Sequence, residues 1–394
     1  MGDLETTRRA LLAGLGPASM LPMAAAAQLI TPPATPLVVN VFDVGGNLAL
    51  SQPAFEAYRR KFPKNVSRFV FSKAPAPELP AKLRAQQDAK RVDIDIVLTG
   101  TDGLSAGMEQ KSWEPLFPNQ AARLPDLDKI LLPAAKRMQT LAENQGCIIS
   151  YYPSGPLLEY MPAKVKQPPG SVEELLAWCR ANPKRFMYAR PANSGPGRTF
   201  IMGLPYLLGD SAPRDPVNGW AKTWAYLEAL SEFIEYYPSG TGATMKELGE
   251  GSRDMIVSTT GWDINPRVLG VVPKEAEIAV LRGFHWVGDS HFAAIPKGLP
   301  PERLAVLLDV VSHLLSKESQ AMAFDRGYLY PGPCVAGVTL DMAPQESQDD
   351  IREFGRPIYD KLIAEVPVEL PLDADKMVLA FRRWDEQVGT KTAK

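Results

Sequence analysis

Short apolar segments alternate with helical segments along the chain from residue 37 onward. Residues 37–42 (LVVNVF), 93–98 (DIDIVL) and 254–258 (DMIVS) have the length and apolar content of buried strands. The intervening segments have helical signals, such as Ser171 and Glu174, which are spaced as a capping box. Strands separated by helices predict βαβ units and mostly parallel sheets. The 394 residues contain no low-complexity linker, so we expect two α/β lobes joined by ordered strands.

Five loops follow predicted strands and are dense in small polar residues. In open α/β sheets, ligands bind beyond the carboxyl ends of the strands. Backbone N–H groups and hydroxyls can approach a ligand closely there, and helix N-termini favour anions. After the first loop, Ser51 and Pro53 predict the start of a helix. The sequence therefore predicts a ligand cleft lined by residues 43–47, 99–103, 193–199, 239–241 and 259–263.

The loop SGPGRT is the sharpest of these candidates. Ser194 and Thr199 offer hydroxyls, and Gly195 allows the backbone to approach a ligand. Arg198 offers a planar fork for a carboxylate or a phosphate. The alternative is a glycine-rich turn that only serves chain geometry, with Arg198 in solvent. The functional interpretation predicts that Arg198 and Ser194 hold an acidic group of a ligand.

Acidic and aromatic residues at other strand ends favour a different ligand. Asp43, Asp102 and Asp263 follow strands, and Trp262 and Trp286 lie nearby in sequence. A tryptophan face beside a carboxylate suits an organic cation. The alternative is that the tryptophans belong to the core and the aspartates cap helices. The full set of predicted ligand contacts is Asp43, Gly46, Asn47, Thr101, Asp102, Tyr152, Ser194, Gly195, Arg198, Thr199, Tyr237, Thr241, Trp262, Asp263 and Trp286.

The pentapeptide YYPSG occurs twice, at residues 151–155 and 236–240. The residues around the two copies do not match, so an internal duplication is not indicated. Tyr152 and Tyr237 could each border the cleft and contact a ligand through the ring or the hydroxyl. Alternatively, both tyrosines pack as hinge and core residues.

Common enzyme and metal-site motifs are missing from the sequence. His285, His291 and His313 do not have the spacing of a metal site. The GDSH segment at residues 288–291 lies in an extended apolar stretch, whereas a hydrolase nucleophile needs a strand-to-helix turn. We therefore predict no catalytic residue, metal site or cofactor. The net charge of −2 offers no broad basic surface for nucleic acid.

The N-terminal residues predict export from the cytoplasm. Arg8 and Arg9 precede a modest apolar run, and Ala25 and Ala27 form an A-x-A-like end. This pattern predicts a twin-arginine signal peptide over residues 1–27 and a soluble mature protein in the periplasm.

The number and spacing of the cysteines indicate whether the exported protein contains a disulfide framework. Cys147, Cys179 and Cys334 are odd in number and form no C-x-x-C pair. We expect buried thiols rather than a disulfide framework.

Several segments together resemble the extracellular solute-binding proteins of bacterial ABC transporters. The segments that show this resemblance are VDIDIVLTGTDGL, CIISYYPSGPLLEYMP, SVEELLAWCRANPKRFMYARPANSGPGRTF, TMKELGEGSRDMIVSTTGWD and the segment from FHWVGDSHFAAIP to YLYPG. The similarity covers roughly residues 36–340. Within this family, the chain is most similar to the branch of spermidine/putrescine, thiamine, ferric-ion and phosphonate binders. Ferric binders have paired tyrosines where this chain has Thr259-Thr260-Gly261-Trp262.

The resemblance implies a two-lobed type II periplasmic-binding fold with mostly parallel sheets flanked by helices. The ligand cleft lies between the lobes. Lobe 1 is expected over residues 36–150 plus 285–338, and lobe 2 over residues 156–283 plus 339–394. The hinge crossings are expected near residues 150–155 and 283–287.

The implied function is capture of a small polar solute for an ABC permease of the inner membrane. A polyamine-like cation or a zwitterion is the favoured ligand, with thiamine, phosphonate and ferric ion as alternatives. The expected state is a monomer. A secreted enzyme on the same scaffold and a ligand-sensing protein are the alternative functions.

Overall fold

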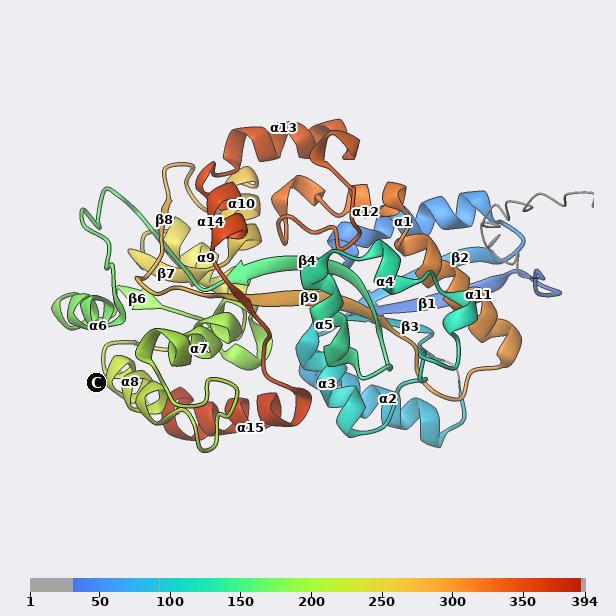
Figure 1. Cartoon of the computed structure of the whole chain (residues 1–394), viewed down its shortest axis with the longest axis horizontal. Helices are drawn as coiled ribbons and strands as arrows, with labels where there is room; N and C mark the ends of the chain where they lie inside the picture. The colour runs from blue at the N-terminus through green and yellow to red at the C-terminus, as the bar shows by residue number, and fades with distance from the viewer. Residues whose placement is uncertain (1–30, 92, 391–394) are drawn as a thin grey trace, which may run out of the picture.

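The protein, seen in a computed structural model, is described over residues 31–91 and 93–390 (Figure 1). The predicted leader, residues 1–27, lies outside these described residues. Two α/β lobes are each built around a sheet, and two long strands run between them (Figure 1). In the described part of the chain, no helix is both long and apolar enough to cross a membrane.

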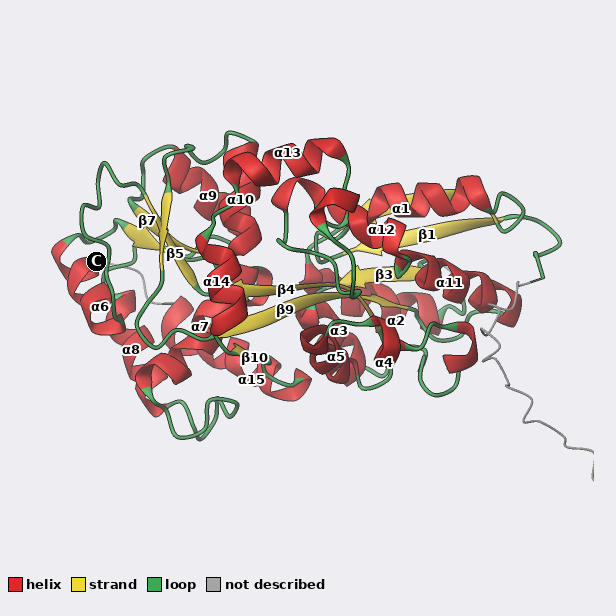
Figure 2. Cartoon of the chain, turned by 45° about the horizontal axis from the view of Figure 1, so that its top comes forward, coloured by secondary structure: helices red, strands yellow, loops and turns green. Residues whose placement is uncertain are grey.

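Lobe 1 contains a six-stranded mixed sheet. Its central strands are parallel, because each is followed by a helix that returns the chain to the same end. Ile96, Val97 and Leu98 are fully buried, since helices cover both faces of the sheet (Figure 2). The strands are β1 (Leu37–Asp43), β2 (Val66–Lys73), β3 (Ile96–Thr99), β4 (Cys147–Gly155), β9 (Trp286–Ala294) and β10 (Val368–Glu369). The helices are α1 (Leu48–Lys61), α2 (Leu79–Asp88), α3 (Thr101–Glu109), α4 (Leu127–Ile130), α5 (Pro133–Gln139), α11 (Pro301–Leu314) and α12 (Lys317–Met322).

Lobe 2 contains a four-stranded sheet in the order β6, β7, β5, β8. β6 and β7 are parallel, but β5 is antiparallel to both of its neighbours. The expected mostly parallel sheet is therefore wrong for this lobe, because β5 continues from β4 instead of following a crossover helix. The strands are β5 (Leu157–Tyr160), β6 (Phe186–Met187), β7 (Met255–Ser258) and β8 (Glu277–Ala279). The helices are α6 (Val172–Ala181), α7 (Gly195–Leu208), α8 (Ala221–Ser231), α9 (Thr241–Gly249), α10 (Thr260–Val268), α13 (Gln345–Phe354) and α14 (Ile358–Glu365).

The strands β4 and β9 connect the two lobes as an antiparallel pair (Figure 1). Their register extends from Cys147 opposite Ala293 to Gly155 opposite Val287. All nine residues of each strand are buried. The connection between the lobes is therefore an ordered two-stranded ribbon, around which a hinge motion could occur.

The C-terminal helix α15 (Ala374–Trp384) contacts both lobes. Ala374 packs against the core of lobe 1. Met377, Ala380 and Trp384 are buried in the core of lobe 2. In Figure 1 this helix runs below α7 and α8 toward α3.

Local capping chemistry explains where two helices begin. The capping box of α6 is present in part, because the Ser171 hydroxyl accepts from the Glu174 N–H at 3.2 Å. The predicted start of α1 near Ser51 is wrong, since this helix begins at Leu48. The observed N-cap is Asn47, four residues before Ser51, and the Asp43 carboxylate satisfies the first turn by accepting from the Leu48 N–H. The three cysteines are buried free thiols, as predicted.

Candidate ligand-binding site

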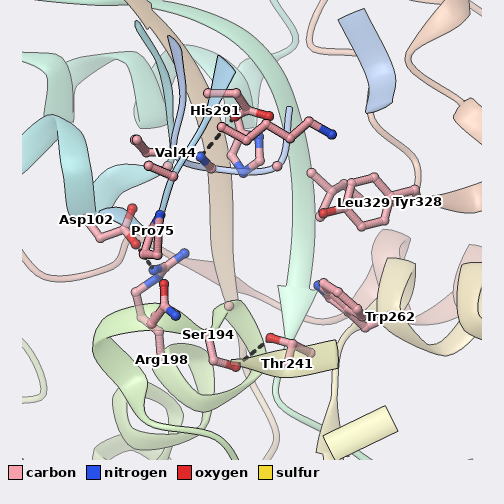
Figure 3. A pocket seen from close by; sticks show the side chains of 18 of the residues that line it. Val44, Pro75, Asp102, Ser194, Arg198, Thr241, Trp262, His291, Tyr328 and Leu329 are labelled. Atoms are coloured by element: carbon pink, nitrogen blue, oxygen red, sulfur yellow. Dashed lines mark hydrogen bonds and ion pairs between the residues drawn. The ribbon is translucent and has the colours of Figure 1, made fainter. Parts of the chain in front are cut away.

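A cavity of about 450 Å³ lies between the two lobes (Figure 3). Figure 3 shows Ser194, Thr241 and Trp262 from lobe 2 facing side chains from lobe 1 and the connecting strands. Strand-end loops supply most of its lining, as the sequence predicts for an open α/β sheet. The lining residues are Asp43, Val44, Gly45, Gly46, Lys73, Ala74, Pro75, Gly100, Asp102, Tyr152, Asn193, Ser194, Gly195, Arg198, Thr241, Trp262, His291, Tyr328 and Leu329.

Five helices begin at this cavity, namely α1, α3, α7, α9 and α10. The Asp43 carboxylate caps α1 by accepting from three backbone N–H groups, at 3.0 to 3.1 Å. Ser194 caps α7 by accepting from the Gly197 N–H at 3.2 Å. The N-cap residues of α3, α9 and α10 make no side-chain hydrogen bond to the first turn. Each N-terminus contributes roughly half a positive charge, so the backbone favours negative charge in the cavity.

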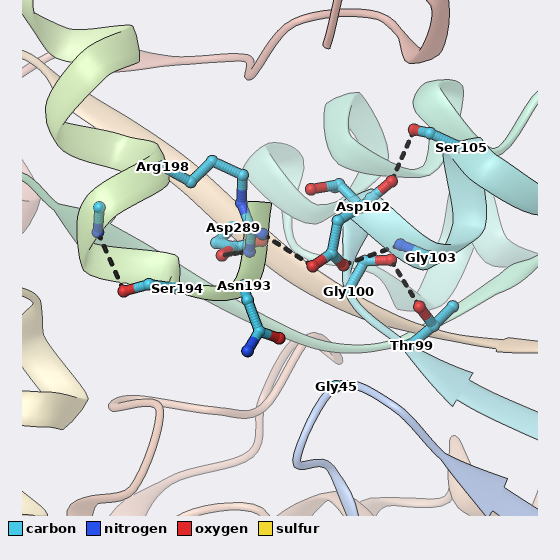
Figure 4. A network of polar contacts seen from close by, with 12 residues as sticks. Gly45, Thr99, Gly100, Asp102, Gly103, Ser105, Asn193, Ser194, Arg198 and Asp289 are labelled. Atoms are coloured by element: carbon cyan, nitrogen blue, oxygen red, sulfur yellow. Dashed lines mark hydrogen bonds and ion pairs between the residues drawn. The ribbon is translucent and has the colours of Figure 1, made fainter. Parts of the chain in front are cut away.

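A buried ion-pair cluster forms one side of the cavity (Figure 4). Arg198 is 5 % exposed, and its Nη1 and Nη2 donate to Asp102 at 3.1 Å and Asp289 at 2.7 Å. Asp102 also accepts from the Gly103 N–H, and Asp289 accepts from the Ser290 N–H. Burial alone would lower the pKa of Arg198, but the charges of Asp289 and Asp102 outweigh burial and raise that pKa above its ordinary value. Arg198 therefore stays charged and is paired with both carboxylates.

Two buried groups on β4 and β9 stay uncharged. Burial lowers the pKa of His291, although the nearby aspartates oppose that shift, so the imidazole is neutral at physiological pH. Burial and then the Asp289 charge raise the pKa of Tyr152 well above its ordinary value. A phenol held protonated in this way is a poor metal ligand. Among residues 31–91 and 93–390, no group of three or more His, Cys, Asp and Glu side chains could hold a metal ion.

Two aromatic rings form another wall. Trp262 of α10 and Tyr328 contact edge to face, with ring centroids 5.6 Å apart. Gly46 has a φ of 79°, and a Cβ atom there would lie 2.6 Å from the Tyr328 hydroxyl. A glycine is therefore required where this tyrosine covers the loop after β1.

Residues 54–351 match the family model described as bacterial extracellular solute-binding protein. The chain belongs to this family. It is a solute-binding protein of the ABC importer type, with a small-molecule ligand, an ABC permease as partner and an extracytoplasmic location.

Solved structures of similar fold include three binding proteins. The periplasmic binding protein AfuA from Actinobacillus pleuropneumoniae, with fructose 6-phosphate bound, is 16% identical with a TM-score of 0.65, over 90% of this chain and 99% of that chain. A putative spermidine/putrescine ABC transporter from Listeria monocytogenes is 13% identical with a TM-score of 0.61, over 90% and 99%. A periplasmic thiamin binding protein is 15% identical with a TM-score of 0.61, over 91% and 99%. The comparison with curated protein sequences gives no match. These likenesses show the two-lobed fold that the resemblance implied.

In this solute-binding protein, the cavity brings together most of the predicted contacts. They come from both lobes and from the connecting strands, so their proximity depends on the fold and not on sequence spacing. The predicted residues that line the cavity are Asp43, Gly46, Asp102, Tyr152, Ser194, Gly195, Arg198, Thr241 and Trp262.

The other predicted contacts lie outside the cavity lining. Tyr237 packs in the lobe 2 core against Tyr188 and Trp384. Trp286 is fully buried, and its indole N–H donates to the Leu362 carbonyl. Tyr237 and Trp286 therefore follow the core alternative, because each is buried in a hydrophobic cluster.

Three polar predicted residues lie directly behind the lining. Asn47 approaches the His291 ring with its amide nitrogen 3.2 Å from Nδ1. Thr101 is the first residue of α3, Thr199 is the fifth residue of α7, and both are buried.

The remaining predicted contact, Asp263, is committed to a structural cluster. It is fully buried and forms ion pairs with Arg267 and Arg356, and it accepts from the Tyr359 hydroxyl. This carboxylate anchors the C-terminal segment to α10 and is not free for a ligand.

Sequence reasoning missed Lys73, His291 and Tyr328. His291 and Asp289 belong to the GDSH segment and share one face of β9 by alternation; His291 lines the cavity, and Asp289 pairs with the lining residue Arg198. That alternation could have found them. Lys73 ends β2, and the loop search did not include this strand end.

Proposed function

We propose that the cavity captures a small solute with at least one anionic group, a zwitterion or an organic anion, and that the protein delivers it to its permease. The observation that carries this proposal is the convergence of five helix N-termini on the cavity. Lys73 and Arg198 balance Asp43 and Asp102 in the lining, and Asp289, which pairs with Arg198, brings the formal charge to −1. Helix N-termini at roughly +0.5 each outweigh that charge.

The hydrogen bonds and ion pairs of the carboxylates also favour an anionic or zwitterionic solute over a polyamine. The three carboxylates already accept hydrogen bonds or ion pairs from the protein. A polyamine would have to take these acceptors away from the α1 N-terminus or from Arg198. Lys73 has no ion pair with any residue in the described part of the chain. Trp262 and Tyr328 offer ring faces and edges to an apolar or cationic part of a zwitterion.

A thermal-shift screen with matched pairs tests the charge preference. One pair is 4-aminobutyrate and putrescine, which have the same number of carbons and differ at one end by a carboxylate in place of an aminomethyl group. A second pair is fructose 6-phosphate, the ligand bound in the similar structure from Actinobacillus pleuropneumoniae, and fructose. A ligand at 100-fold its Kd should add about 2.7 kcal/mol of stability. Stabilisation by putrescine but by no anionic partner would contradict the proposal.

Three further properties belong to this proposal. We infer that the protein acts without catalysis, as a monomer, and that it reaches the periplasm by the twin-arginine route. The twin arginines Arg8 and Arg9 motivate the last point. Replacing both with lysine should leave the protein in the cytoplasm, and unchanged export in a fractionation assay would exclude this route.

A further inference from the structure

A buried ion pair crosses from one lobe to the other beside the cavity. We propose that Arg198 is a positioning residue that holds the two lobes together before a solute binds, through Asp102. This role differs from the anion anchor that the sequence predicts for Arg198. It does not depend on the charge of the solute.

The three partners come from three different parts of the fold (Figure 4). Arg198 lies in the first turn of α7 in lobe 2, which the Ser194 cap fixes. Asp102 lies in the first turn of α3 in lobe 1. Asp289 lies on β9, which connects the lobes. The guanidinium therefore joins lobe 2 to both the connecting strand and the opposite lobe.

A hinge opening would affect the Arg198–Asp289 and Arg198–Asp102 ion pairs differently. Asp289 lies opposite Tyr152 in the ribbon of β4 and β9, so its distance to the start of α7 changes little during bending around that ribbon. Asp102 moves with lobe 1, so the Arg198–Asp102 pair must break when the lobes separate. The Asp102 side chain is 14% exposed and the Asp289 side chain 1%. Asp102 is thus the partner that can move into solvent.

Breaking this contact is costly because the guanidinium is buried. The Arg198 side chain is 6% exposed and has two carboxylate partners, so loss of one partner leaves part of its charge uncompensated. The closed arrangement therefore has a stabilising contact that needs no solute. A population that is already closed binds more tightly than one that must close first.

The Asp102→Asn variant tests the proposal in the solute-free protein. The asparagine keeps the size of the side chain and an oxygen for the Gly103 N–H, but it removes the charge that pairs with Arg198. We expect a larger radius of gyration in small-angle X-ray scattering, with a return to the wild-type value on addition of the strongest stabiliser from the matched-pair screen. If the closed population falls to about one tenth, the apparent Kd rises about tenfold.

The matched control is Asp254→Asn. Asp254 forms an ion pair with Arg185, and both residues lie within lobe 2, so the loss of this pair should not change the radius of gyration. A second variant, Arg198→Lys, keeps the positive charge but cannot bridge both carboxylates, and it should expand the protein as Asp102→Asn does. Circular dichroism confirms that each variant is folded.

The outcomes separate positioning from direct solute contact. Expansion of Asp102→Asn and Arg198→Lys without expansion of Asp254→Asn supports the proposal. A compact solute-free Asp102→Asn protein overturns it, whether or not solute affinity falls. Since scattering of the solute-free protein needs no ligand, this result stands even if the proposed solute class fails.

Discussion

Lys73 is the cationic side chain with the clearest access to the cavity. It ends β2, lines the cavity, and has no ion pair among the described residues. An ammonium that pairs with an anionic solute should contribute about 1.5–3 kcal/mol, as charged hydrogen bonds do. We expect Lys73→Gln to weaken binding of the best anionic solute by roughly tenfold or more.

The matched control for this prediction is Lys64→Gln, because Lys64 is an exposed lysine of lobe 1 outside the cavity lining. Titration calorimetry measures both variants against the anionic solute and its uncharged or cationic partner. An equal loss of affinity for both members of a pair would show that Lys73 does not select charge.

Glu159 makes the stability of lobe 2 depend on pH. This β5 residue is fully buried, and burial followed by the Asp263 charge raises its pKa well above 4.5. The folded state therefore holds a proton that the unfolded state releases above pH 4.5, so stability falls as pH rises from there toward the folded pKa. We expect Glu159→Gln to reduce the loss of stability between pH 5 and pH 8.

Urea unfolding at both pH values measures this effect, which can reach about 1.4 kcal/mol for each pH unit in the window. Glu275→Gln is the control, since Glu275 is exposed. A pH dependence of the Glu159→Gln variant equal to that of the wild type would exclude Glu159 as its source.

At the scale of single residues, sequence could predict loops better than side-chain directions. Gly46 and Asp102 were predictable because they follow β1 and β3, where parallel sheets place ligands. Thr241 lines the cavity too, but the strand expected before it is wrong, because α8 and an irregular segment precede α9. Asp263 also follows a strand, but α10 turns its carboxylate toward Arg267 and Arg356 from a segment far along the chain. Long-range pairing of this kind leaves no local sequence signal.

At the scale of elements, the alternation of strands and helices was predictable and the exact starts were less so. The start of α9 at Thr241 and its end at Gly249 follow local glycine signals. The start of α1 depends on Asp43, which lies before the helix and was interpreted as a ligand contact. The direction of β5 depends on the lobe crossing, which is a property of the whole fold.

The contact between α10 and the segment after η5 (Asp325–Gly327) leads to a prediction about one glycine. A Cβ atom on Gly261 would lie 2.1 Å from the Leu329 nitrogen and 2.4 Å from its Cα. Both neighbours are backbone atoms, so the segment must move. We expect Gly261→Ala to destabilise the protein by about 1–3 kcal/mol and to weaken solute binding, because Trp262 and Tyr328 lie on the two displaced elements.

Gly242→Ala is the matched control in α9, because a Cβ atom there meets nothing within 4 Å. This control should be neutral or stabilising by up to about 1 kcal/mol, as alanine favours helix. Urea unfolding compares the two variants. Equal stabilities would mean that the close contact of α10 with Leu329 does not constrain the fold.

At the scale of the whole molecule, the two lobes share more than the connecting strands. The C-terminal helix α15 places Ala374 against lobe 1 and Trp384 in lobe 2. The sequence of this segment does not indicate that one helix contacts both cores. Periodicity identifies an apolar face without identifying what that face packs against.

Trp384 is therefore expected to stabilise lobe 2 and, through α15, to couple it to lobe 1. It is 1 % exposed, its indole N–H donates to the Tyr188 hydroxyl at 3.0 Å, and its ring contacts Tyr237. Truncation to alanine removes this packing at a cost of about 3–5 kcal/mol. We expect hydrogen exchange at rising urea to show both lobes of the wild type opening together, whereas in Trp384→Ala the strands of lobe 2 open first.

The half-buried Trp178 provides the control truncation, which should lower stability less and leave the lobes coupled. If the lobe 1 strands lose as much protection as the lobe 2 strands in Trp384→Ala, the two lobes form a single cooperative unit that does not depend on α15.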